Sequence, residues 1–483
     1  MKTNFIILNH YINSFFIIGV IIFNTLFANA QSDTNNVFTL NDLYQSMMAN
    51  HPVVKQALTL PIQARQEIRM ARGTGFDPKF TSGYDEKRYN GTDYFTIWQN
   101  QLKIPTWFGA EFKAGYDEAY GKYLNPERTV PNNGLSYLGI SVAVGQGLFI
   151  DQRRATLRQS QLSQKINEAE KVKLINKILY QAAKDYWNWY FHYNKFKSLE
   201  IGYNFALERY EFVKKRVNIG EEAAIDSTEA LILLQNRYVT YSQSQMELQN
   251  ASLELSNHIW GPSDTPLELT INAKPETFNP KTNSEDTNTV QILIQYAKKN
   301  HPELLKFDFK IGQLNIEKKL AIENIKPIIN LNYNLLGAGI NASNNISSGI
   351  YKDYYKTGFD VVVPLFLRKE RAKLQVTKLK IKQTEFERSF TSRQISNEIM
   401  QFFNELKNSE RLLSTQTKLI ENYYILKEAE FNKFNNGESS LFLVNTRETN
   451  LIDARIKRAE LEAKYEKSKA GLYWSAGKNN IEQ

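Results

Sequence analysis

Two very long helical patterns constrain this chain more than any other feature of its sequence. The first covers about 151 to 218 and the second about 367 to 435. At a rise of about 1.5 Å per residue, each would be on the order of 100 Å long. Helices of that length cannot pack inside a compact globule. The chain is therefore expected to form an elongated structure.

The spacing of apolar residues predicts how these helices pack. Ile175, Leu179, Ala182, Tyr186 and Trp189 are spaced alternately four and three, which is a heptad pattern typical of coiled-coil neighbours. The helices predicted over 224–260 and 441–476 return after tight turns at Gly220 and Gly437. Antiparallel helical hairpins follow, and the aromatic cluster over 186–191 is interpreted as core packing.

The sequence is internally duplicated, because short motifs recur in the same order. Asn50-His51-Pro52 returns as Asn300-His301-Pro302, Gly147-Leu148-Phe149 as Pro364-Leu365-Phe366, and Gly220 as Gly437. We expect a first repeat over 31–270, with a helix, a β-hairpin region over 79–146, a long helix over 151–218 and a helix over 224–260. A linker over 271–284 leads to a second repeat over 285–483, with a helix over 285–326, a β-hairpin over 328–366, a long helix over 367–435 and a helix over 441–476.

The segments between the helices have the period of β-strands. Asn330, Asn332 and Asn334 alternate with apolar residues from Ile329 to Leu335. A sheet packed on helices would show the same alternation, but a row of asparagines suits a water-filled lumen better than a protein-covered face. The pattern favours transmembrane strands with Asn330, Asn332 and Asn334 facing the lumen.

Export is indicated by the beginning of the sequence. Lys2 precedes an apolar core, and Ala28-Asn29-Ala30 fits a cleavage site, so residues 1–30 are predicted to be a signal peptide. The alternative is an uncleaved membrane anchor, but the apolar core is short and no stop-transfer charges follow it. The chain has no cysteine. After this segment no apolar run reaches the roughly 18 residues of a membrane helix, so strands would have to cross any bilayer.

Association is required if those strands enter a membrane. One hairpin per repeat supplies four strands, and the longer insert from about 89 to 135 could add a second hairpin, so four or six strands per chain are expected. A small closed barrel needs about eight strands. Open sheet edges in lipid are costly, so several copies would have to share one barrel.

No catalytic chemistry is evident, and we expect no enzyme, cofactor or metal site. The five histidines show no metal-ligand spacing, and no nucleophile motif or phosphate-binding glycine loop occurs. The formal net charge is +9, but the charges are interspersed along helical faces. Nucleic acid is therefore not expected as a partner.

Taken together, these motifs resemble the TolC-type outer-membrane efflux protein family. The likeness spans about Leu40 to Gly477 and includes Ala224-Ile225-Asp226 after the first tip and Trp260-Gly261 at a helix end. The resemblance implies a mainly helical homotrimer with a periplasmic α-barrel and a transmembrane β-barrel of twelve strands that the copies share. It implies the outer membrane of a Gram-negative bacterium, and partners comprising outer-membrane lipid, a periplasmic adaptor protein and an inner-membrane transporter. The chain would then be the exit duct of a tripartite efflux or type I secretion system.

The hairpin tips are the candidate entrance. Gly220, Glu221, Glu222 and Asp226 lie at the first tip, and Gly437 and Glu438 lie at the second. The glutamates could form a cation-selecting ring that contacts the adaptor, or they could be solvated turn residues. Asp226 could link neighbouring hairpins, or it could only begin a helix. Leu443 and Thr446 stand where the family often has aspartates, which puts an inherited aspartate ring in doubt.

A different function class fits part of the same pattern. A coiled-coil scaffold or adhesin that spans the periplasm without transport would need the same long helices and a small membrane-anchoring sheet. A helical enzyme is a third alternative. The sequence does not indicate the transported substrate or the class of pump.

Overall fold

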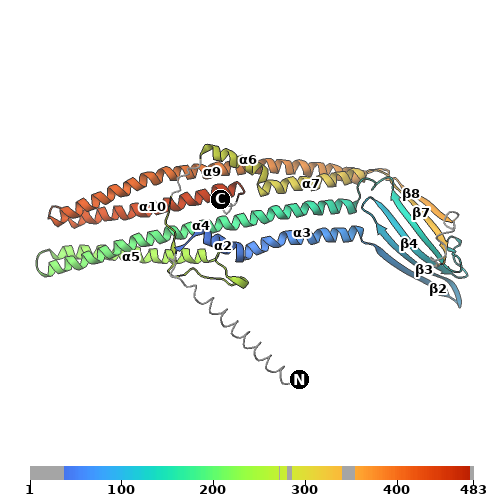
Figure 1. The fold of residues 1–483 in the computed structure, drawn as a ribbon, viewed down its shortest axis with the longest axis horizontal. Coiled ribbons are helices and arrows are strands. Elements are labelled where there is room, and N and C mark those ends of the chain that lie inside the picture. Colours follow the sequence, from blue (N-terminus) through green and yellow to red (C-terminus); the bar gives the residue numbers. More distant parts are fainter. Residues whose placement is uncertain (1–36, 271, 280–285, 340–353, 479–483) are drawn as a thin grey trace, which may run out of the picture.

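The computed structural model describes residues 37–270, 272–279, 286–339 and 354–478 (Figure 1). The molecule is a long rod with a β-sheet at one end and two helical-hairpin tips at the other. The predicted signal peptide over 1–30 lies outside the described residues, as does part of the predicted linker. The elongated shape expected from the helix lengths is confirmed.

Eight α-helices form the rod within the described residues. The first repeat contains α2 (Leu40–Asn50), α3 (Pro52–Phe76), α4 (Gln152–Asn218) and α5 (Ala224–Ser256). The second contains α6 (Thr287–Asn300), α7 (Pro302–Glu323), α9 (Arg368–Asn435) and α10 (Leu441–Ser475). The two long helices, α4 with 67 residues and α9 with 68, match their predicted bounds closely. None of the described helices is both long enough and apolar enough to cross a membrane.

The single helix predicted over 285–326 is wrong, because the Asn-His-Pro motif divides it into α6 and α7. His301 has extended backbone, and its Nδ1 accepts a hydrogen bond from the Glu303 N–H at 3.2 Å. His51 makes the same bond with the Val53 N–H at 3.1 Å, between α2 and α3. Each histidine therefore caps a new helix whose first residue is proline, where the missing N–H costs nothing.

The sheet contains six antiparallel strands in the order β2-β3-β4-β5-β7-β8. Four come from the first repeat, namely β2 (Lys79–Tyr89), β3 (Thr92–Pro105), β4 (Ala110–Tyr120) and β5 (Leu135–Ala143). The second repeat adds β7 (Ile328–Ala338) and β8 (Tyr355–Val362). The longer first insert thus forms a second hairpin, which decides between the four and six strands left open by the sequence.

Part of the predicted linker is structured. Lys274–Pro275 forms β6, which pairs in parallel with β1 (Val37–Phe38) near the middle of the rod. Short 3₁₀ turns occur at Pro126–Arg128 and Pro262–Asp264. Strands of two residues carry no readable period, which is why the sequence pattern did not predict this pairing.

The helices lie side by side in one row that continues along the rod. Near the sheet the order across the row is α3, α4, α7 and α9, and toward the tips it is α5, α4, α10 and α9. The core lies midway, where Tyr186, Trp187, Trp189 and Tyr190 of α4 are buried. The predicted packing role of this aromatic cluster is confirmed. One edge of the row belongs to α3 and α5, and the other edge belongs to α9.

Candidate functional site

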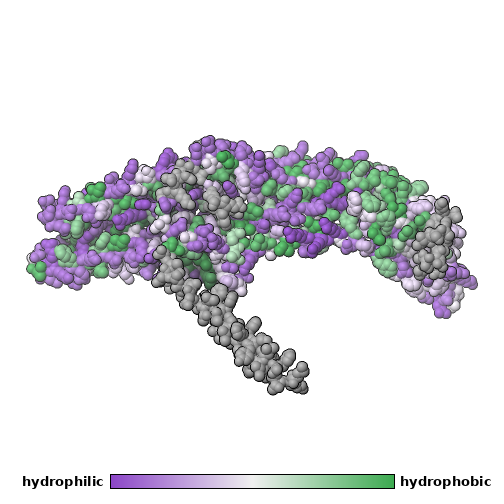
Figure 2. Space-filling model, in the orientation of Figure 1, coloured by the Kyte–Doolittle hydropathy of each residue, from purple (hydrophilic) through white to green (hydrophobic). Residues whose placement is uncertain are grey.

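The strand register gives the sheet one apolar face. Directly paired residues of neighbouring strands point to the same side. Leu102 on β3 pairs with Phe80 and Ala114, and Ala114 pairs with Leu138, which pairs with Leu335. The same face carries Trp98, Ile104, Phe112, Ile140, Leu331, Phe359 and Val361. Several of these side chains are exposed, and Figure 2 shows hydrophobic residues gathered over the part of the sheet that adjoins the long helices.

The opposite face is polar, and it carries the three predicted asparagines. Lys113 Nζ lies 3.3 Å from Asn332 Oδ1, and Asn332 Nδ2 donates to Asp360 Oδ2 at 3.2 Å. Asn330 and Asn334 lie on the same face because they are two residues away along β7. Asp117 on β4 interacts electrostatically with Lys356 on β8, although two strands separate them. Side chains of this face therefore converge, as they do on the inside of a curved sheet.

Both edges of the sheet lack a partner strand within the described residues. Every residue of β2 and every residue of β8 is exposed. Because the six strands alternate in direction, β2 and β8 run in opposite senses. A β8 edge could thus pair in antiparallel fashion with the β2 edge of a second copy.

The two hairpin tips have the same backbone geometry. Gly220 and Gly437 have φ of +80° and +76°, which is the left-handed region that favours glycine. The Glu221 N–H donates to the Arg216 carbonyl at 2.9 Å, and the Glu438 N–H donates to the Lys433 carbonyl at 2.9 Å. These bonds are typical of a Schellman ending, so the tips predicted at Gly220 and Gly437 are confirmed as helix ends.

The acidic residues of the tips differ in their surroundings. Arg216 pairs with Glu221 at 3.2 Å and with Glu222 at 2.9 Å, so both carboxylates of the first tip share one cation. Asp226 Oδ2 accepts from the Ala223 N–H at 3.2 Å and thereby caps α5. Glu438 makes no ion pair among the described residues. The helix-starting role of Asp226 is observed, whereas a selective ring and a link between copies stay predictions.

An ionic clasp near the tips was not predicted from the sequence. Arg209 on α4 binds Glu448 on α10 through two hydrogen bonds, at 3.0 and 2.6 Å, and both side chains are largely buried. Arg237 on α5 donates to Thr449 at 2.6 Å, and burial lowers its pKa. This clasp joins the two hairpins of one chain.

Comparison of the two repeats in the sequence could have pointed to this clasp. Residues 217 positions apart are equivalent, so Arg209 corresponds to Leu426 and Glu448 corresponds to Leu231. At both positions, one repeat has a charged residue where the other repeat has leucine, so the two repeats differ in chemistry there. Because the two charged residues have opposite signs, an ion pair between them is a natural expectation.

A second polar cluster was also missed. His258 Nε2 lies 2.8 Å from Asp185 Oδ2, and the His258 ring stacks on His51 with 6.0 Å between the ring centroids. Burial, followed by the nearby His258, lowers the pKa of His51. The sequence pattern did not join Asp185 to His258, because the two meet only where the chain after α5 returns against α4.

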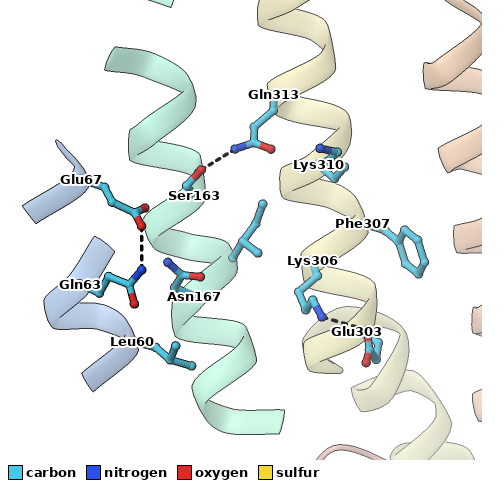
Figure 3. Close-up of a pocket in the computed structure, with 11 residues that line it drawn as sticks. Leu60, Gln63, Glu67, Ser163, Asn167, Glu303, Lys306, Phe307, Lys310 and Gln313 are labelled. Atoms are coloured by element: carbon cyan, nitrogen blue, oxygen red, sulfur yellow. Dashed lines mark hydrogen bonds and ion pairs between the residues drawn. The ribbon is translucent and has the colours of Figure 1, made fainter. Parts of the chain in front are cut away.

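The groove between α3, α4 and α7 has a volume of about 490 Å³ (Figure 3). Several of its polar side chains are engaged with one another. Gln313 donates to Ser163 at 2.8 Å, Gln63 donates to Glu67 at 3.1 Å, and Lys306 lies 3.5 Å from Glu303. The bond between Gln313 and Ser163 joins α7 to α4, whereas the other two contacts lie within α3 and within α7. Among the described residues, no group of three or more histidine or carboxylate side chains is placed to hold a metal ion.

Comparison with solved structures identifies the fold. The chain is similar to the CmeC outer membrane channel of Campylobacter jejuni, with a TM-score of 0.65, 15% identity, and coverage of 93% of this chain and 90% of that one. It is similar to the outer membrane protein VceC of Vibrio cholerae, with a TM-score of 0.64, 14% identity and coverage of 91% and 96%. For the open state of the MtrE outer membrane channel of Neisseria gonorrhoeae, the TM-score is 0.65, the identity is 12% and the coverage is 91% and 89%.

No protein-family model and no curated protein matches the chain. At 12–15% identity, the likeness to solved structures concerns the fold. That fold is the one implied by the sequence resemblance, so the predicted fold is confirmed for the single chain. The neighbours named above are outer-membrane proteins, and two of them are described as channels.

Proposed function

We propose that this chain is the outer-membrane exit channel of a tripartite efflux or secretion system in a Gram-negative bacterium. The observation that carries the proposal is the six-stranded sheet, which has one apolar face, one polar face and two unpaired edges. Its apolar face fits membrane lipid, and its polar, converging face fits a water-filled lumen with Asn330, Asn332 and Asn334 on its wall. Substrate would pass through unchanged, without catalysis or cofactor.

The sheet edges favour a barrel shared between copies. In a bilayer, unpaired backbone groups of β2 and β8 would each cost several kcal/mol. An even number of strands per chain lets β8 pair antiparallel with β2 of the next copy all around a ring. With three copies, the number that the sequence resemblance implies, six strands each would close a barrel of eighteen, rather than the twelve strands that the resemblance implies. Barrels of about 16–18 strands leave an aqueous channel.

The helical edges favour the same ring. On α5, a heptad stripe is more than half exposed at every position, comprising Ile225, Ile232, Val239, Met246 and Leu253. On α9, the exposed apolar side chains include Leu379, Phe386, Leu412, Leu419 and Leu426. Stripes of this kind require a partner helix. A second copy supplies one, because each copy carries the α5 edge on one side and the α9 edge on the other.

Duplication predicts how those edges meet. Within one chain, α4 packs on α10. Since α9 is the duplicate of α4 and α5 is the duplicate of α10, α9 of one copy should pack on α5 of the next in the same way. Twelve long helical segments at each level, four from each of three copies, would then enclose a tunnel continuous with the barrel lumen.

The hairpin tips lie at the end of the rod away from the sheet, where a periplasmic adaptor and an inner-membrane transporter would dock (Figure 1). Gly220, Glu221, Glu222, Asp226, Gly437 and Glu438 would form the entrance. Glu438 is the best candidate for a free charge there, since Glu221 and Glu222 already share Arg216.

Planar-bilayer recording on the purified protein tests this function. We expect stable insertion with discrete, trimer-sized conductance steps, and outer-membrane fractionation of the protein in cells. Variants with Glu448→Ala, which opens the clasp between hairpins, should raise the conductance if the tips restrict the pore. Stable insertion without conductance in both wild type and variant would contradict the channel and favour a scaffold.

A further inference from the structure

Four lysines lie in one row across the polar face of the sheet. Lys79 on β2 pairs with Lys103 on β3, and Lys103 pairs with Lys113 on β4. The same row continues through Gly139 on β5 and Asn334 on β7, and it ends at Lys356 on β8. Every side chain in this row is on the face that we assign to the lumen.

The row places like charges directly opposite each other, and nearby carboxylates offset only part of that charge, Glu111 at Lys113 and Asp117 at Lys356. Like charges directly opposite each other on neighbouring strands destabilise a sheet. Lys113 has Asn332 as a hydrogen-bond acceptor and Glu111 at 3.9 Å. Within the described residues, Lys79, Lys103 and Lys356 form no ion pair within 4.0 Å. A row of lysines that destabilises the sheet therefore suggests that its positive charge serves a function in the lumen.

The acidic residues of the polar face are arranged differently. Asp85, Glu111, Asp117 and Asp360 each lie in a separate row, and each pairs with uncharged neighbours. The face as a whole is therefore close to electrical balance, but its positive charge is concentrated in one row. Local concentration, rather than net charge, sets the potential that a passing solute meets.

We propose that this lysine row is an anion-attracting band on the barrel wall, and that it gives the channel a preference for solutes bearing carboxylate or phosphate groups. The inference rests on the proposed channel function. Strands of a barrel tilt by about 35–45°, so the row would climb along the wall as a slanting band rather than a flat ring. Three copies would carry three such bands around one lumen.

The test uses bilayer recordings with inositol hexakisphosphate as a polyanionic probe, added to each compartment in turn. We expect the wild-type channel to be blocked more strongly from one side, where the probe reaches the barrel without crossing the helical tunnel. The double variant Lys103→Gln/Lys113→Gln should need at least about tenfold more probe for half block, and its reversal potential in a KCl gradient should shift toward cation preference.

Two matched variants serve as controls. Lys103→Arg/Lys113→Arg keeps the charge and should keep the block. Lys87→Gln/Lys122→Gln removes two charges outside the row and should leave the block unchanged. Equal block of wild type and Lys103→Gln/Lys113→Gln, or a conducting wild type that the probe does not block, would overturn the band.

Failure of the channel itself gives a different result. If the wild-type protein inserts without conducting, the proposed channel function is contradicted. The anion-attracting band must then be tested by a binding measurement. Isothermal titration of the detergent-solubilised protein with the same probe should then show at least about tenfold weaker binding for Lys103→Gln/Lys113→Gln than for the arginine variant. Equal binding would overturn the band in that case too.

Discussion

Helices α5 and α10 occupy equivalent places in the two repeats, yet they use the same face differently. Met246 and Leu253 on α5 are exposed, whereas their counterparts Ala463 and Ala470 on α10 are buried in the core with α4. One copy of the helix thus has its partner within the chain and the other copy does not. The difference supports the proposal that the α5 face packs on a second molecule.

The ionic clasp shows a second difference between the equivalent helices. Arg209 and Glu448 join α4 to α10, while Leu426 and Leu231 occupy the equivalent positions on α9 and α5. The contact within a chain is ionic and the expected contact between chains is apolar. In the proposed assembly, one docking geometry would thus be used twice, with ionic chemistry within a chain and apolar chemistry between chains.

The largest effect is expected from charging the exposed α5 stripe. Val239→Asp/Met246→Asp should abolish oligomer assembly because it places carboxylates in the apolar seam between copies, while the chain keeps its own helices. Crosslinking and sedimentation of the detergent-solubilised protein measure the loss. Ala463→Asp, at the position on α10 equivalent to Met246, should instead unfold the chain itself. Oligomers that survive the α5 double variant would contradict the assignment of this face.

Breaking the clasp should have the next largest effect. Glu448→Ala leaves the buried Arg209 without its carboxylate, and loss of one partner of a buried ion pair costs about 3–5 kcal/mol. Denaturant unfolding of the dissociated chain measures the change. Leu426→Ala, at the position equivalent to Arg209, removes a partly exposed side chain and should change the dissociated chain by less than about 1 kcal/mol. Similar losses for the two variants would mean that the two seams do not differ as described.

The histidine caps predict a pH dependence. Burial lowers the pKa of His301 to about 4, and its Nδ1 must be unprotonated to accept from the Glu303 N–H. In the unfolded chain histidine has a pKa near 6.5, so the unfolded state takes up the proton first as the pH falls. The stabilising effect is complete above about pH 6.5 and is lost progressively toward about pH 4.

Asparagine also caps helices but does not titrate. His301→Asn should therefore flatten the decline in melting temperature between pH 6.5 and pH 4 while changing stability at pH 7.5 only slightly. The equivalent His51→Asn variant should flatten it too, since burial also lowers the pKa of His51. A decline that is just as steep in the variants would show that these caps do not cause it.

The smallest effect is expected at the tips. Gly220→Ala and Gly437→Ala introduce a side chain into open space but at a left-handed φ, so each should cost about 1 kcal/mol. Hydrogen exchange at the tips measures the local loss. The two costs should agree within about 0.5 kcal/mol, because both tips have the same Schellman hydrogen bonds. A cost confined to one tip would break the equivalence of the repeats.

Periodic features of the fold could be predicted from the sequence. The helical pattern and the duplication located α4 and α9 to within a residue or two, and alternation around Asn332 placed the polar and apolar faces of β7 correctly. The number of strands could not be predicted, because 89–135 is rich in aromatic residues and turns without a clean period. The breaks at His51 and His301 were missed because the helical pattern continues on both sides of each motif.

Contacts between segments that are distant in the sequence could not be predicted from residue spacing. Arg209 and Glu448 are 239 residues apart, and Asp185 and His258 are 73 residues apart. Neither pair lies within one helical turn, so spacing rules do not join them. The lysine row shows the same limit, since Lys79, Lys103, Lys113 and Lys356 share a row only once the strand register is known.

The central claim, that α9 of one copy packs on α5 of the next as α4 packs on α10, can be tested by disulfide crosslinking. Gly202 lies against Ile452 within one chain, and the equivalent positions between chains are Leu419 and Gln235. The chain has no native cysteine, so the variant Leu419→Cys/Gln235→Cys reports on this contact alone. Oxidation should convert the protein to covalent trimers, while the control Leu412→Cys/Gln235→Cys, displaced by one heptad, should stay monomeric on denaturing gels. Monomers from both variants, or equal crosslinking of both, would contradict the claim.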